Sequence, residues 1–157
     1  EYLVEAFNRL SPEEANGFRL MVAGEPWDNG KVRDAIARSP YRDRIIFVDR
    51  YLSDEEVYEA FSGADAAVFP YTRASQCAAA LTATAFGLPV IVSRVGGLEE
   101  TMVSYKGAIF VKPRDVDDLR GALLKVREMR GRRFEHPHTW EQAARGFEKV
   151  FEKLGVI

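Results

Sequence analysis

Short apolar runs alternate along the chain with longer segments whose apolar residues recur at helical spacing. The apolar runs show little polar–apolar alternation; residues 18–23, for example, read Phe-Arg-Leu-Met-Val-Ala. Runs of this kind are typical of parallel strands that are covered on both faces. The pattern therefore predicts five buried strands, at residues 18–23, 44–48, 64–69, 89–92 and 108–111.

The intervening segments carry helix-start signals. Ser53 is followed three residues later by Glu56, and Thr139 is followed in the same way by Gln142. This spacing lets the two side chains satisfy backbone amides at the start of a helix. The predicted helices cover residues 1–10, 31–38, 53–62, 76–86, 97–104, 115–130 and 140–154.

Strands that alternate with helices indicate a parallel sheet with helices on both faces. We therefore predict a single doubly wound α/β domain over residues 1–157, with five strands and no internal repeat. Ligands of such sheets bind beyond the carboxyl ends of the strands. The loops of interest follow Ala23, Val48, Phe69, Val92 and Val111.

Composition excludes several classes of protein. The 157 residues have a formal net charge of −2, with 46% hydrophobic and 29% charged residues, which is ordinary for a globular domain. A balance so near neutral gives no electrostatic footprint for nucleic acid. No apolar run approaches the ~18 residues of a membrane span. The lone Cys77 cannot form an internal disulfide, which favours a reducing compartment, and we expect a cytoplasmic location.

The stretch after the third predicted strand is the most informative. Small residues from Ser75 through Gln76 and Cys77 to Ala78 would leave backbone amides open at a helix start, and such amides bind anions, a diphosphate among them. The alternative is that Ser75 only caps the helix. Arg73 and Arg94 flank this stretch, and we expect both to be solvated.

Three further features are weaker candidates. Gly96 and Gly97 permit either close ligand approach or a plain tight turn. His136 and His138 lack the ligand spacing of a zinc site, so we expect solvated loop histidines and no metal. The apolar stripe of the last helix predicts either core or a docking face.

The order of several motifs resembles a known enzyme family. Residues 64–70 read Ala-Asp-Ala-Ala-Val-Phe-Pro, 86–93 read Phe-Gly-Leu-Pro-Val-Ile-Val-Ser, and 95–100 read Val-Gly-Gly-Leu-Glu-Glu. In this order they resemble the C-terminal, donor-binding half of retaining GT-B glycosyltransferases, the family-four or group 1 enzymes, over nearly the whole chain. The resemblance implies a Rossmann-like fold that binds a nucleotide sugar in the cleft between two domains.

The resemblance also implies roles for particular residues. The loop of Asp49, Arg50 and Tyr51 would lie beside the base, and residues 75–78 would receive the diphosphate through backbone amides. The family usually has two glutamates eight residues apart, for the donor sugar and the ribose, and those positions here are Ala74 and Thr82.

Both carboxylates are therefore missing, and residues 75–78 are closer to a Ser-Gln-Ser-Gly version of the loop that some members carry. Thr82 is seven residues from Ser75, so we expect it on the same helix face, where its hydroxyl would contact a ribose more weakly than a carboxylate does.

The family also has a central strand and a loop with phosphate-neutralising Arg and Lys before the point where this chain starts. These residues and the N-terminal acceptor domain are not present in the 157 residues. We therefore expect the missing acceptor domain or a partner chain to complete the site, and this chain alone to be inactive. Any peripheral membrane contact would be through the missing half.

Three interpretations remain open. The chain is the donor-binding half of a glycosyltransferase, or a degenerate non-catalytic domain of that fold that acts in binding or assembly, or an unrelated α/β phosphate binder. The third would not need the motifs at 85–93 and 95–100. If the protein is catalytic, the amides and helix dipole would stabilise the leaving diphosphate, and no metal or other cofactor is expected.

Overall fold

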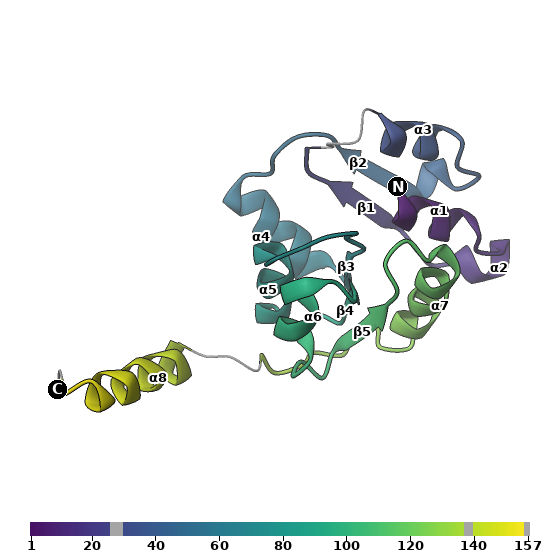
Figure 1. Ribbon diagram of the computed structural model, residues 1–157. Helices are drawn as coiled ribbons and strands as arrows, with labels where there is room; N and C mark the ends of the chain where they lie inside the picture. The colour runs from purple at the N-terminus through teal and green to yellow at the C-terminus, as the bar shows by residue number, and fades with distance from the viewer. Residues whose placement is uncertain (26–29, 137–139, 156–157) are drawn as a thin grey trace.

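The computed structural model describes residues 1–25, 30–136 and 140–155, which form helices and short parallel strands (Figure 1). Each predicted strand is present and begins within three residues of its expected start. Helix α2 and the 3-10 turn η1 were not predicted. In chain order the elements are α1 (Tyr2–Asn8), α2 (Pro12–Ala15), β1 (Leu20–Ala23), α3 (Lys31–Ala37), η1 (Arg42–Arg44), β2 (Ile45–Val48), α4 (Asp54–Gly63), β3 (Ala67–Phe69), α5 (Ala78–Ala85), β4 (Val90–Ser93), α6 (Gly96–Met102), β5 (Ala108–Val111), α7 (Val116–Arg127) and α8 (Trp140–Lys153).

The five strands lie in two parallel sheets. Strand β1 pairs with β2, with Leu20 opposite Ile45. Strand β4 pairs with β3 on one side and with β5 on the other. The α/β fold class with five parallel strands is confirmed. The single sheet that the sequence predicted is divided, because β1 and β3 pair with each other nowhere among the described residues.

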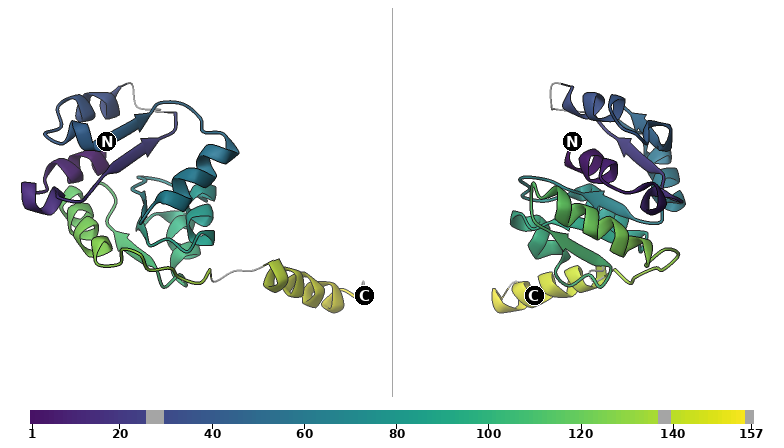
Figure 2. Two further views of the ribbon diagram at one scale, coloured as in Figure 1. Left: turned by 180° about the vertical axis from the view of Figure 1, so that it is seen from behind. Right: turned by 90° about the vertical axis from the view of Figure 1, so that its right-hand side faces the viewer.

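Helix α1 joins the two sheets. Its Ala6 packs in a cluster with Ile91 of β4 and Leu119 of α7, whereas its Phe7 packs in a second cluster with Leu20 of β1. Figure 2 shows α1 beside α7 and close to the β1–β2 sheet. Fully burying a side chain such as Phe7 contributes about 1.5–3 kcal/mol, so α1 ties the two halves of the fold together.

The prediction of five fully buried strands was wrong for β1 and β2. All four residues of β4 are buried, but burial alternates along β1. Met21 is 43% exposed and its register partner Ile46 is 52% exposed. One face of this small sheet packs against α1 and α2, and the other is open to solvent.

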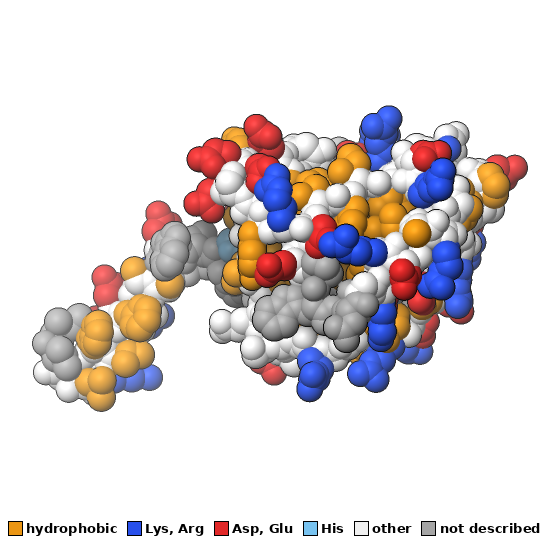
Figure 3. Space-filling model, turned by 90° about the horizontal axis from the view of Figure 1, so that it is seen from above, with side chains coloured by type: hydrophobic (Ala, Val, Ile, Leu, Met, Phe, Trp, Pro, Cys, Tyr) orange, Lys and Arg blue, Asp and Glu red, His pale blue; other side chains and the backbone are white. Residues whose placement is uncertain are grey.

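Helix α8 lies apart from the remainder of the described chain (Figures 1 and 2). Phe147 is 65% exposed and Val150 is 51% exposed. Figure 3 shows apolar side chains along this outlying helix. The expectation that its stripe joins the core was therefore wrong, and a docking face stays a prediction. The predicted capping residue Thr139 lies outside the described residues.

Candidate functional site

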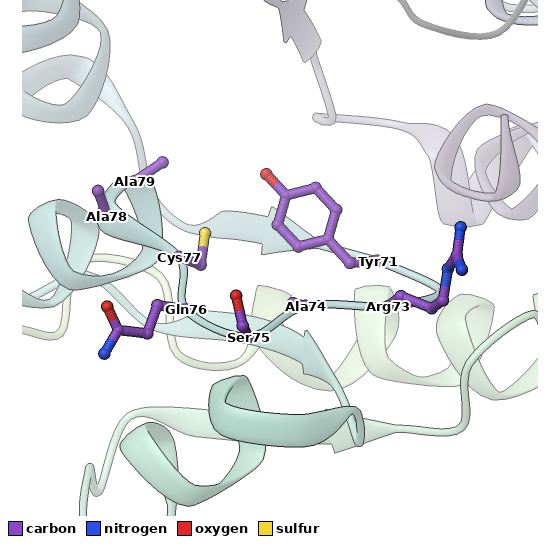
Figure 4. A pocket seen from close by; sticks show the side chains of 8 residues that line it. All are labelled: Tyr71, Arg73, Ala74, Ser75, Gln76, Cys77, Ala78 and Ala79. Carbon is purple, nitrogen blue, oxygen red and sulfur yellow. The ribbon is translucent and has the colours of Figure 1, made fainter.

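A cavity of about 760 Å³ lies at the carboxyl end of β3, where the chain turns into α5. This is the edge at which parallel sheets bind ligands. Eight residues line the cavity, and Figure 4 shows their side chains. They are Tyr71, Arg73, Ala74, Ser75, Gln76, Cys77, Ala78 and Ala79. All four residues predicted for the diphosphate, and Ala74, are therefore brought together at one cavity.

The helix start at this cavity differs from the prediction. Helix α5 begins at Ala78, and its N-cap is Cys77, whose Sγ accepts a hydrogen bond of 3.3 Å from the amide of Ala80. The expectations that the helix begins at residue 76 and that Ser75 caps it were both wrong. The amides of Ala78 and Ala79 have no acceptor among the described residues, as expected for the first turn of a helix.

The side chains around the cavity differ in direction. In Figure 4 the Ser75 hydroxyl and the Cys77 thiol point toward the side on which the Tyr71 ring lies, whereas the Gln76 amide points away. Burial, and then the neighbouring Cys77, raise the pKa of Tyr71 to about 12. A phenol is protonated near neutral pH even at its ordinary pKa, and the Tyr71 hydroxyl is hydrogen-bonded to the Cys77 side chain.

The cavity has one cationic side chain and no carboxylate among its lining residues. Arg73 is exposed, as predicted, and its guanidinium has no carboxylate partner among the described residues. Arg94, by contrast, is not simply solvated. It forms an ion pair with Glu99, and its guanidinium lies 4.8 Å from the centre of the Phe110 ring.

The residues predicted for the base are not among those that line the cavity. Asp49 forms an ion pair with Arg33. Arg50 donates to both carboxylate oxygens of Glu56, at 2.8 and 2.5 Å. The third, Tyr51, is 71% exposed. The structure thus gives Asp49 and Arg50 local partners, and their role toward a base stays a prediction.

Thr82 is also not one of the lining residues. Its hydroxyl donates to the carbonyl oxygen of Ala78 at 3.0 Å. The expectation that it shares a helix face with Ser75 was wrong, because Ser75 precedes the first residue of α5. While it donates to Ala78, the Thr82 hydroxyl can make a ribose contact only as an acceptor, from a ribose hydroxyl.

Gly96 and Gly97 form the first turn of α6 and lie against the backbone of Ala74 and Ser75. They are not lining residues themselves. The sequence prediction assigned no role to Tyr71 or Ala79, although the rule that ligands bind after a strand points to the whole segment between β3 and α5.

The described residues were also compared with the expectations for a metal site, for the histidines and for a membrane span. In residues 1–25, 30–136 and 140–155, no three His, Cys, Asp or Glu side chains gather as a metal site would require. His136 is not simply solvated, because its Nδ1 lies 3.0 Å from the Oγ1 of buried Thr84; His138 lies outside the described residues. None of the described helices is long and apolar enough to cross a membrane.

The chain belongs to a family of sugar transferases. The family "Glycosyl transferases group 1" matches residues 1–147. The chain is also similar to the MMP alpha-(1->4)-mannosyltransferase of Mycolicibacterium hassiacum, with 32% identity over 164 residues that cover 97% of this chain and 39% of that protein. The resemblance seen in the motifs is therefore confirmed.

Solved structures show the same GT-B fold. An apo structure of OtsA superposes with a TM-score of 0.68 and 15% identity, and covers 81% of this chain and 32% of its own. HepE of Anabaena in complex with UDP gives a TM-score of 0.65 and 15% identity, over 81% of this chain and 35% of its own. The chain thus spans between 32% and 39% of the length of these three proteins.

Proposed function

We propose that this chain is the nucleotide-sugar-binding half of a retaining glycosyltransferase, and that residues 75–78 hold the donor diphosphate. The observation that carries the proposal is the open first turn of α5. The amides of Ala78 and Ala79 are available at a cavity beyond the carboxyl end of β3. The helix dipole adds partial positive charge at the same point.

In this proposal the chain contributes to transfer by binding the leaving group. The bond between the sugar's anomeric carbon and the phosphate oxygen breaks, and a bond to the acceptor hydroxyl oxygen forms on the same face of the sugar. The proton of that hydroxyl passes to the departing diphosphate oxygen. The negative charge that develops on the departing diphosphate is stabilised by the fixed amides. The Tyr71 phenol lines the same cavity and is a further polar group there. This stabilisation needs no metal, so nucleotide binding is expected to persist in a chelator.

The remaining contacts belong to the same proposal. Thr82 would contact the ribose, the backbone at Ala74 would lie on the sugar side, and the loop from Asp49 to Tyr51 would lie near the base. An acceptor domain, in the same protein or a partner chain, would supply the other wall of the cleft. We place the protein in the cytoplasm, where nucleotide sugars are available.

A second candidate is a non-catalytic domain that binds or assembles without transferring sugar. The observation that favours it is that the residues lining the cavity include no carboxylate and no histidine. Both candidates bind a nucleoside diphosphate. They differ in whether a longer protein that contains this chain releases the nucleoside diphosphate in the presence of acceptor.

Calorimetric titration with UDP tests the diphosphate site. Ala78→Asp places a negative charge at the first residue of α5, and we expect about tenfold weaker binding, or about 1.4 kcal/mol. Ala85→Asp is the matched control, because it adds the same charge to an exposed position seven residues along, about 10 Å away. Equal UDP affinity in folded Ala78→Asp and the parent chain would contradict the site.

A further inference from the structure

The first turn of α6 is in direct backbone contact with the segment that forms the cavity. A β-carbon added at Gly97 would overlap the carbonyl oxygen of Ser75 and lie 3.1 Å from its carbonyl carbon. A β-carbon added at Gly96 would overlap the carbonyl oxygen of Ala74. Ala74 and Ser75 both line the cavity.

Neither overlap can be relieved by a side-chain rotation, because the obstructing atoms are main-chain carbonyl oxygens. Helix α6 cannot easily retreat, since its Leu98 and Met102 are each 1% exposed in the core around β4. Close-packed interiors resist displacements of this size. The exposed segment at residues 73–76 would therefore be the part that moves.

We propose that Gly96 and Gly97 are positioning residues. Their close contact with the backbone of Ala74 and Ser75, called the glycine contact below, holds that backbone in place and so determines the shape of the cavity. They act sterically, by leaving room for two carbonyl oxygens, and they need not contact a ligand. The glycine contact is independent of the proposed function. Its consequence for nucleotide binding rests on the proposed diphosphate site.

Gly97→Ala is the cleaner test, because Gly96 also has a positive φ of 44°, which strains any other residue there. Gly121→Ala is the matched control: it is a helical glycine in α7, and nothing lies within 4 Å of its added β-carbon. The direct readout is the reaction rate of Cys77, the only cysteine of the chain, with a thiol reagent such as Ellman's.

Cys77 is partly buried and its Sγ is held by the Ala80 amide, so a displaced segment exposes it. We expect Gly97→Ala to raise the Cys77 rate about threefold or more and to weaken UDP binding about tenfold, and Gly121→Ala to change neither. An unchanged rate of reaction of Cys77 with the thiol reagent in folded Gly97→Ala overturns the proposed role of the glycine contact. A raised rate in a chain that binds none of UDP, GDP and ADP, even at millimolar concentration, supports the glycine contact and contradicts the proposed diphosphate site instead.

The unaltered chain provides a second test in case Gly97→Ala does not fold. In an isotope-labelled sample, the α-protons of Gly97 should show nuclear Overhauser contacts to protons of Ser75 and Gln76. Their presence supports the glycine contact. Their absence from a spectrum in which the resonances of residues 73–76 are assigned overturns it.

Discussion

At the scale of single residues, the Thr84 hydroxyl links α5 to the segment that follows α7. Its Oγ1 donates to the carbonyl of Leu81 at 2.8 Å, and it lies 3.0 Å from Nδ1 of His136. A hydroxyl has one proton, so the proton of the second hydrogen bond must come from Nδ1. Thr84 is 1% exposed, which leaves water little access to this pair.

Thr84→Val should therefore lower the free energy of unfolding by about 1 kcal/mol, because it removes the Oγ1 that hydrogen-bonds to Nδ1 of His136. Thr82→Val is the matched control on the same helix. Its hydroxyl donates only to Ala78, and we expect a change within about 0.5 kcal/mol. Urea denaturation of the two variants measures the difference, and equal losses would contradict the Thr84–His136 link. UDP titration of Thr82→Val tests the ribose contact at the same time.

Residue-level features were predictable from the sequence only where the partners are close along the chain. The Ser53–Glu56 capping box is present as predicted. The same signal at Ser11 and Glu14 caps α2, a helix that was not predicted. The partner of His136 lies 52 positions away, and no local pattern specifies it. The cap at Cys77 was missed because thiols are not preferred N-caps.

At the scale of elements, we expect the stability of the first turn of α4 to depend on pH. The side chain of Arg50 and the backbone amide of Ser53 hydrogen-bond to the Glu56 carboxylate, and in that order they lower its pKa from 4.5 to about 2. Because the folded state binds the proton more weakly than the unfolded state, this carboxylate stabilises the fold above pH 4.5. That contribution is lost as the pH falls toward about 2.

Glu56→Gln should flatten this part of the stability profile and leave the profile above pH 5 parallel to that of the parent chain. The measurement is the urea midpoint from about pH 5 down to pH 2. Salt should weaken the contribution, since the side chains of Arg50 and Glu56 are 57% and 37% exposed. An identical slope in the two proteins would contradict the assigned role of Glu56.

The two sheets should differ in hydrogen exchange. Strand β4 is paired on both sides and buried at every position, whereas Met21 and Ile46 of the smaller sheet are exposed. We expect amides of β1 and β2 to exchange about tenfold or more faster than those of β4. Strand β5, paired on one side among the described strands, provides the intermediate comparison. Equal protection in both sheets would mean that they open as one unit.

This difference marks a limit of sequence analysis at the scale of elements. Apolar runs predicted the positions of all five strands, because strands of parallel sheets are rich in apolar residues. The same runs predicted complete burial of β1 and β2, which the structure does not show. An apolar strand indicates that burial of its side chains is favourable, but it does not indicate which segment packs against them.

At the scale of the whole molecule, the order of motifs predicted the family that the comparisons confirm. The location of the cavity was also predictable, because parallel strands place their carboxyl ends at one edge. The packing of Gly96 and Gly97 against Ala74 and Ser75 was not predictable, since it joins the first turn of α6 to the loop after β3 through backbone atoms. The ion pair of Asp49 with Arg33 of α3 depends likewise on how separate elements meet.

We expect this chain by itself to bind a nucleoside diphosphate weakly and to transfer no sugar. Its cavity offers neutral amides, one exposed arginine and a helix dipole worth about 0.3–1 kcal/mol per charge. It has no carboxylate or histidine in its lining to act as a base. Transfer also requires an acceptor held against the donor sugar, and the chain spans 39% of the mannosyltransferase that it resembles.

The measurement is release of nucleoside diphosphate and of product from several nucleotide sugars, with and without acceptors. The parent chain and Ala78→Asp are assayed side by side, so that a trace contaminant appears equally in both. Turnover by the parent chain that Ala78→Asp abolishes would show that these residues hold a complete active site. It would overturn the expectation that a second domain supplies the acceptor side, and would leave the diphosphate site itself supported.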